Sequence, residues 1–180
     1  MKHISRRRFL KLGMLAAALP LPAWASQGLS AGERRLGFHN LHTGENLDLT
    51  YWAEGDYVPE SLAEINHLLR DYRNNAVAAI HPQLLDLLHR VKAELGTSQP
   101  FQVISGYRSP ATNQMLADHS SGVAKHSLHM EGKAIDIRIP GIQLADLRQT
   151  GLLLQGGGVG YYPESNFVHL DVGRVRTWGA

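Results

Sequence analysis

The segment 133–139 restricts the fold of this chain more than any other, because its side chains alternate in character. Three isoleucines occupy every second position, and Asp136 lies among the residues between them. Successive side chains of a strand point to opposite faces, so this pattern predicts a half-buried strand with Asp136 facing away from the core. A carboxylate in the middle of a strand needs a partner, since burying it alone is costly.

A second alternating segment, 166–172, lies close to the C-terminus. His169 and Asp171 fall on one face of the predicted strand, and the apolar side chains of Val168 and Leu170 fall on the other. The two polar side chains are therefore expected to point together, away from the core.

The rest of the chain predicts helices mainly before strands. Pro59 and Pro82 stand at the start of two segments with helical apolar spacing, and Gly96 suits the end of the second one. We expect helices over 59–73, 82–95, 109–118 and 141–154, strands over 36–41, 46–52, 101–105 and 158–162, and a loop over 120–130. This order indicates an α+β fold with one domain over 36–180, in which helices pack on one side of a small, mainly antiparallel sheet.

The absence of cysteine limits the chemistry that the chain can carry out. None of the 180 residues is a cysteine, which excludes disulfides, thiolate nucleophiles and Cys-ligated zinc. Any chemistry must therefore come from histidine, carboxylate, serine or arginine side chains, or from a metal ion.

Residues 1–25 have the layout of a bacterial export signal. Five basic residues and no acidic one occupy this stretch, an apolar run covers 12–21, and Ala23-Trp24-Ala25 matches an A-x-A cleavage site. The apolar run is shorter than the ~20 residues that a membrane span needs. The arginines at 6 and 7, followed by Phe9-Leu10-Lys11, favour a twin-arginine signal, with an ordinary secretory signal or an uncleaved anchor as alternatives. Residues 26–35 are then expected to form a flexible lead-in.

The charge balance argues against nucleic-acid binding. The chain has 18 basic and 16 acidic residues, but without 1–25 it has 13 basic and 16 acidic ones, a net charge of about −3. Proteins that hold nucleic acid by neutralising phosphates are typically basic. We also expect no stable membrane span after removal of the signal.

Three dispersed side chains are candidates for a common metal site. A loop that folds His129 back over the strand 133–139 would bring it to Asp136, and His169 would join them from the second strand. Two nitrogens and one oxygen leave a fourth zinc position open, as in catalytic sites. The alternative is a His–Asp hydrogen bond without a metal ion. The histidines at 39, 42, 67 and 89 are expected to be structural or solvated.

Arg108 is a further candidate, because it follows the predicted strand 101–105 and precedes a helix that starts near Pro110. An arginine there can hold a carboxylate with two hydrogen bonds or face a developing oxyanion. The alternative is a surface arginine beside a turn. The glycine run 156–158 lacks the spacing of a phosphate-binding loop and is expected to let the backbone approach a substrate or bend a strand.

Three motifs together resemble the D-Ala-D-Ala metallopeptidase family. They are Ser-Gly-Tyr-Arg-Ser at 105–109, Ser-x-His-x-x-Gly-x-Ala-x-Asp at 127–136, and a late histidine at His169. The longer strings 40–45, 157–163 and 165–169 resemble the YcbK-type branch, that of murein endopeptidase K. The resemblance extends over about 36–178, nearly the whole chain after the signal.

This resemblance implies one Zn²⁺ per chain, held at the sheet surface by His129, Asp136 and His169. It implies hydrolysis of amide bonds in peptidoglycan peptide cross-links, including those that join two diaminopimelate residues, with Arg108 contacting a substrate carboxylate or the transition-state oxygen. Peptidoglycan stem peptides would be the partner and the periplasm the location, in agreement with the export signal.

One departure from the family pattern concerns the general base. Relatives often place a histidine or glutamate two or three residues before the last ligand, where this chain has Phe167 and Asn166. Asp171 is the nearest replacement, either as the base or as a support for the ligand histidine. Glu131 and His126 are weaker candidates for the base.

Three other functions remain open at this point. The chain could be a D-alanyl-D-alanine carboxypeptidase that trims the same polymer, or a peptidoglycan-binding module that keeps the metal without turnover. It could also use the metal only to stabilise a small domain, in which case removing the metal should unfold the chain.

Overall fold

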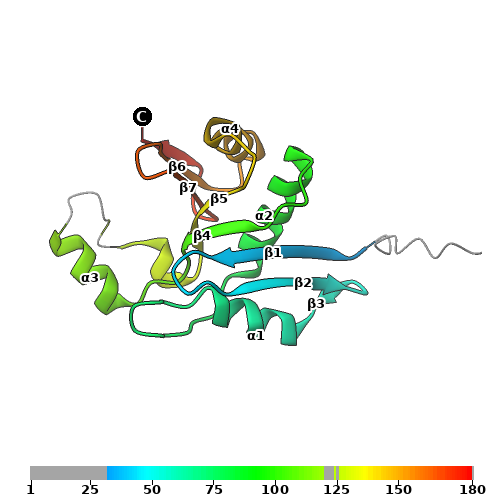
Figure 1. Ribbon diagram of the computed structural model, residues 1–180, viewed down its shortest axis with the longest axis horizontal. Coiled ribbons are helices and arrows are strands. Elements are labelled where there is room, and N and C mark those ends of the chain that lie inside the picture. Colours follow the sequence, from blue (N-terminus) through cyan, green and yellow to red (C-terminus); the bar gives the residue numbers. More distant parts are fainter. Residues whose placement is uncertain (1–31, 120–123, 125, 180) are drawn as a thin grey trace, which may run out of the picture.

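The computed structural model of the protein describes residues 32–119, 124 and 126–179, and within them the chain forms one α+β domain (Figure 1). The export signal predicted over 1–25 lies outside the described residues. Eight strands form a single sheet in the order β3-β2-β1-β4-β5-β7-β6-β8. The strands are β1 (Arg34–Asn40), β2 (Asn46–Ala53), β3 (Asp56–Tyr57), β4 (Phe101–Ser105), β5 (Ala134–Arg138), β6 (Gly158–Tyr162), β7 (Phe167–Asp171) and β8 (Arg176–Trp178).

Four α-helices and one short 3-10 helix accompany the sheet in the described part of the chain. They are α1 (Pro59–Leu68), α2 (Pro82–Leu95), α3 (Pro110–His119), α4 (Leu144–Leu154) and the 3-10 helix η1 (Leu128–Glu131). None of the helices in residues 32–119, 124 and 126–179 has the length and apolar character of a membrane span.

The sheet is mainly antiparallel, as predicted, but it is larger than expected. Only the pairs β1–β4 and β6–β8 are parallel among the pairings of the described strands. The two short strands β3 and β8 lie at the edges and were not predicted, because two or three residues carry no alternation that could be recognised. The lead-in predicted over 26–35 also ends earlier than expected, because β1 already begins at Arg34.

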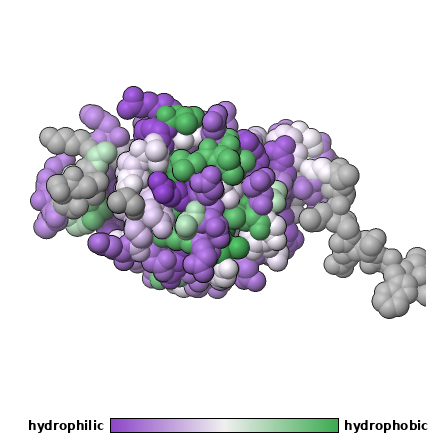
Figure 2. All heavy atoms as spheres, turned by 90° about the horizontal axis from the view of Figure 1, so that it is seen from above, coloured by the Kyte–Doolittle hydropathy of each residue, from purple (hydrophilic) through white to green (hydrophobic). Residues whose placement is uncertain are grey.

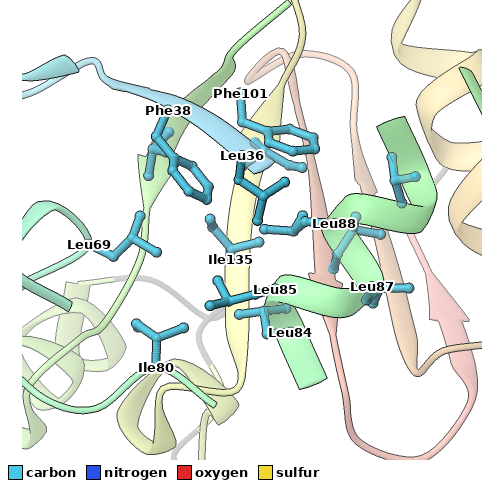
Figure 3. Close-up of a cluster of buried hydrophobic side chains, with 14 of the residues drawn as sticks. Leu36, Phe38, Leu69, Ile80, Leu84, Leu85, Leu87, Leu88, Phe101 and Ile135 are labelled. Carbon is cyan, nitrogen blue, oxygen red and sulfur yellow. The ribbon is translucent and has the colours of Figure 1, made fainter. Parts of the chain in front are cut away.

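One continuous core joins the sheet to three of the helices. Buried apolar residues of α1, α2 and α4 belong to the same cluster as those of the strands. Figure 3 shows Ile135 of β5 among Leu36 of β1, Phe101 of β4 and the leucines of α2. The prediction of helices on one side is confirmed for α1, α2 and α4. Helix α3 lies apart at one end of the domain, and its buried side chains are polar (Figure 1).

Helix α2 has the predicted bounds, whereas α1 is shorter than predicted. Pro82 begins α2, and Gly96 ends it with a φ of 60°. The helix predicted over 59–73 ends at Leu68, because the carboxylate of Asp71 accepts hydrogen bonds from the backbone N–H groups of Arg73 and Ser109. A partner 38 residues away along the chain thus ends the helix.

The face of the molecule seen in Figure 2 is largely hydrophilic. Apolar patches interrupt it, and four large hydrophobic side chains among the described residues are exposed, namely Val77, Met115, Leu153 and Val175.

The two faces of β5 and β7 differ as the alternation predicted. Ile135 and Ile137 are fully buried in the core beneath the helices, and Asp136 points to the opposite face. Asp136 pairs with His169 in the antiparallel ladder of β5 and β7, so the two side chains are direct neighbours on that face. Because Ser105 of β4 also pairs with Asp136, one row of side chains crosses the sheet at this level.

The turn after η1 depends on a close backbone contact at Gly132. This residue has a φ of +64°, and a Cβ atom there would overlap the carbonyl oxygen of Ala79. We expect Gly132→Ala to lower the free energy of unfolding by about 3 kcal/mol or more, because the backbone of the 76–81 segment must move. Urea denaturation of the purified domain measures this loss.

Gly141→Ala is the matched control, because Gly141 also has a positive φ of +76° but no atom within 4 Å of the added Cβ. Its loss should be only about 1 kcal/mol, the cost of a left-handed backbone for alanine. Equal losses in the two variants would contradict the importance of the contact at Ala79.

Candidate metal centre

His129 lies in η1, and its backbone and ring are both fixed by hydrogen bonds. The Ser127 side chain caps η1 by accepting the His129 N–H, and the ring is almost fully buried. The Nδ1 atom of His129 lies 2.7 Å from the carbonyl oxygen of Gly106, which can only accept a hydrogen bond. Nδ1 therefore carries a proton, and the Nε2 lone pair points toward β5 and β7.

His169 is held in the same manner by Asp171. Its Nε2 lies 3.0 Å from Asp171 Oδ2, and its Nδ1 lies 2.9 Å from Asp136 Oδ1. A proton on Nε2 satisfies the first contact, so the Nδ1 lone pair of His169 faces Asp136.

Three ligand atoms thereby converge on one point. His129 Nε2 lies 3.2 Å from His169 Nδ1 and 3.3 Å from Asp136 Oδ1. Together with the third separation of 2.9 Å, these distances form a triangle of ligand atoms. A tetrahedral zinc ion with bonds of about 2.0–2.1 Å has edges of ~3.3 Å, so the residues fit this metal. Three converging electron-pair donors also repel one another unless a cation or a proton lies between them.

The electrostatics of the cluster agree with a site for a cation. Burial alone would raise the pKa of Asp136, but the adjacent His129 and His169 outweigh burial and hold that pKa well below its ordinary value. Burial alone would lower the pKa of His169, but hydrogen bonds with Asp136 and Asp171 raise it to about 8. The carboxylate of Asp136 is thus anionic at neutral pH, ready to accept a positive partner.

Arg108 lies next to the cluster with most of its hydrogen-bonding capacity unused. Its Nη2 is 3.6 Å from Asp136 Oδ2 and 3.4 Å from Ser105 Oγ, both long contacts. Its buried Nε–H has no hydrogen-bond partner among the described residues. Burial lowers the pKa of Arg108, and the backbone around it is fixed because Arg108 N–H bonds to the carbonyl of His129.

A cavity of about 570 Å³ opens above His129, Asp136 and His169. Its wall is partly aromatic, because Tyr162 stacks on Phe167 with ring centres 4.5 Å apart, and the Tyr162 hydroxyl oxygen accepts a hydrogen bond from Trp178 Nε1–H. The residues that line it are Arg108, Ala124, His126, Ser127, Leu128, His129, Asp136, Tyr162, Ser165, Phe167, His169, Arg176 and Trp178.

The structure separates the candidates for the general base. Asp171 is fully buried on the far side of the His169 ring, and Glu131 is exposed and paired with Lys133. His126 lines the cavity, as does Phe167, whereas Asn166 lies in the turn between β6 and β7 with a φ of 54°.

Sequence reasoning did not single out Arg176 and Trp178, which complete the cavity from β8. The guanidinium of Arg176 bonds to the carboxylate of Asp171 and lies 4.8 Å from the ring centre of Trp178. The only sequence signal was the two-residue spacing of Arg176 and Trp178, which places both side chains on one face of a strand.

The raised pKa of His169 predicts a pH dependence for the metal-free protein. Because the pKa of about 8 lies above the ordinary value of 6.5, the stabilisation is fully present below pH 6.5 and is lost as pH rises through 8. A shift of this size corresponds to about 2 kcal/mol of unfolding free energy. Urea denaturation in the presence of a chelator, on either side of this window, measures the loss.

The matched control is His169→Gln, which should lose most of this dependence because glutamine does not titrate. If the unmodified domain is equally stable on both sides of the window, the proton on His169 does not stabilise the fold.

Comparison with known proteins identifies the family of this chain. A family model described as peptidase M15_2, peptidoglycan L,D-endopeptidase MepK, matches residues 29–178. Proteins named peptidoglycan L,D-endopeptidase MepK from Escherichia coli (strain K12) and Shigella flexneri are each 47% identical to this chain over 177 residues, covering 97% of both sequences. A relative from Haemophilus influenzae is 40% identical over 97% of this chain and 95% of its own length. The chain therefore belongs to the M15_2 family of peptidases, that of peptidoglycan L,D-endopeptidase MepK.

Proposed function

We propose that this protein is a zinc-dependent murein endopeptidase that hydrolyses amide bonds in the peptide cross-links of peptidoglycan. The observation that carries the proposal is the convergence of His129 Nε2, His169 Nδ1 and Asp136 Oδ1 at the floor of a cavity, beside the largely buried Arg108. The names of the relatives, peptidoglycan L,D-endopeptidases, supply the class of substrate.

Zinc suits the proposed site better than other metals. Two imidazole nitrogens and one carboxylate oxygen leave one coordination position for water or substrate, the arrangement of catalytic zinc sites. The same ligands also suit ferrous iron, but open iron sites of this kind usually serve oxygen chemistry. The chemistry that a zinc ion supplies is Lewis acidity, which polarises a carbonyl oxygen and lowers the pKa of water to about 7.

Arg108 binds the substrate in this proposal. Its guanidinium is largely buried and carries a positive charge, and its Nε–H has no partner among the described residues, so a carboxylate or a developing oxyanion would complete its hydrogen bonds. Stem peptides carry carboxylates beside their amide bonds, which matches this requirement. Because the Arg108 N–H donates to the carbonyl of His129, the residue proposed to bind substrate is joined through the backbone to a proposed metal ligand.

A residue that transfers a proton during hydrolysis must reach the cavity. Asp171 acts through His169, as a support for that ligand, because its carboxylate is buried behind the imidazole ring. Of the three candidates from the sequence, His126 is the one that lines the cavity, so we assign it the transfer of a proton to the leaving amine.

The substrate lies outside the cytoplasm, so the proposal includes export. Residues 1–25 would act as a twin-arginine signal, and the peptidase domain would work in the periplasm. A twin-arginine signal exports folded proteins, which would allow the metal to be bound before transport.

The first test is digestion of isolated peptidoglycan by the purified domain, with and without a chelator. Dimeric muropeptides should be converted to monomers, the chelator should block conversion, and added zinc should restore it. The chelated protein should keep its far-UV circular dichroism, because the apolar cluster lies on the opposite face of the sheet from the ligands.

The other outcomes of this digestion distinguish the rival functions. Release of free alanine without loss of dimers would indicate a carboxypeptidase, and no conversion by a folded, zinc-loaded protein would indicate a binding module. Unfolding on chelation would indicate a metal that only stabilises the domain.

The second test concerns Arg108. Arg108→Gln should lower kcat/KM on cross-linked muropeptides by roughly 10²–10³-fold, the usual cost of losing one donor to a transition-state oxygen, while bound zinc stays stoichiometric. Arg138→Gln is the matched control. Arg138 lies on the same face of β5 as Asp136, but its side chain bonds to Gln102 and is not among the residues that line the cavity. Equal activity in the two variants would remove Arg108 from the proposed mechanism.

A further inference from the structure

We infer that Arg176 is a positioning residue of the metal centre, which acts on the ligand His169 through Asp171. The inference rests on the metal site proposed above and assigns a role to the last strand of the sheet. Its basis is a continuous chain of contacts from Arg176 to Asp171, from Asp171 to His169, and from His169 to Asp136.

Arg176 and Asp171 form a two-point contact. Arg176 Nη1 lies 3.0 Å from Asp171 Oδ1, and Nη2 lies 2.6 Å from Oδ2. A paired contact of this kind fixes the plane of the carboxylate as well as its position. Since Oδ2 is also the atom that accepts the His169 Nε2–H, Arg176 sets the direction from which the imidazole ring is held.

The surroundings of Asp171 leave this carboxylate no other freedom. Oδ1 accepts hydrogen bonds from the backbone N–H groups of Gly158 and Gly173, at 2.9 and 2.8 Å. The side chain is fully buried, and a buried carboxylate without a positive partner is strongly destabilised. Arg176 is the positively charged partner that stabilises the Asp171 carboxylate in its buried position next to His169.

The pairing of strand β8 with β6 places Arg176 beside Asp171. It pairs in parallel with β6, where Gly158 stands opposite Arg176 and Gly160 opposite Trp178. A Cβ atom at Gly158 would overlap the guanidinium of Arg176 and the carboxylate of Asp171, and one at Gly160 would overlap the indole of Trp178. The side chains of Arg176 and Trp178 thus lie in the space that side chains at these two positions of β6 would otherwise fill.

Trp178 holds the guanidinium from the other side. Its ring lies under Arg176, and its Nε1–H donates to the hydroxyl of Tyr162 at 2.8 Å, which fixes the orientation of the indole. The same ring contacts His169, with ring centres 5.1 Å apart. Arg176 therefore lies between a fixed anion and a fixed aromatic ring, and its side chain is 31% exposed.

The experiment measures zinc affinity by competition with a chromophoric chelator, which does not depend on activity. Arg176→Gln should bind zinc about tenfold more weakly than the unmodified protein, and Asp171→Asn about 10–100-fold more weakly, the usual range for groups that orient a ligand. The double variant should lose no more than Asp171→Asn alone, because Arg176 acts through Asp171. Arg174→Gln is the matched control, since Arg176 bonds to the backbone carbonyl of Arg174, which the substitution keeps.

The outcomes separate this inference from the proposed function. If the unmodified protein binds no zinc, the metal site itself is wrong. If it binds zinc and folded Arg176→Gln binds equally well, or if the losses of the two single variants simply add, the positioning role is wrong. Should Arg176→Gln fail to fold, Arg176→Lys decides: it keeps the charge but not the paired contact, so it should bind zinc severalfold more weakly, and unchanged affinity would overturn the inference.

Discussion

The pairing of Asp136 with His169 across β5 and β7 is the contact on which the whole site depends. It places a carboxylate and an imidazole side by side on the face opposite the apolar core, while Ile135 and Leu170 of the same strands enter the core. A slip of the register by one residue would exchange the two faces and bury both charged groups among leucines. The apolar core and the candidate metal centre are therefore specified by the same alternation, one on each side of the sheet.

This dependence explains which parts of the protein the sequence predicted well. The bounds of α2 follow from Pro82 and Gly96 and needed no distant information, and the facing of β5 and β7 follows from local alternation. The end of α1 could not be predicted in this way, because Asp71 accepts a hydrogen bond from Ser109, which lies far along the chain. The convergence of His129 with the strands came from its motif and the family resemblance, and metal binding itself stays a prediction.

On the face that carries the site, some polar groups have full sets of hydrogen bonds and one does not. Asp171 receives hydrogen bonds or ion-pair contacts on both oxygens, and each imidazole ring is held through the nitrogen that points away from the cluster. Arg108, by contrast, is largely buried, and its Nε–H has no partner in the part of the chain that the structure describes. Groups that orient the ligands are saturated, and the group proposed to meet the substrate is not, so the free energy of satisfying it remains available for binding.

The two histidines differ in what holds them, and this difference has a consequence for sequence variation within the family. His129 is held by the main-chain carbonyl of Gly106, an atom that every amino acid possesses, whereas His169 depends on the side chain of Asp171. Substitutions near Gly106 cannot delete its acceptor and can only displace it, and a Cβ at that position would collide with the Leu69 carbonyl. No substitution can therefore remove the acceptor that holds His129. The acceptor that holds His169 is a side chain, so a substitution at position 171 can replace it and thereby change how His169 is held.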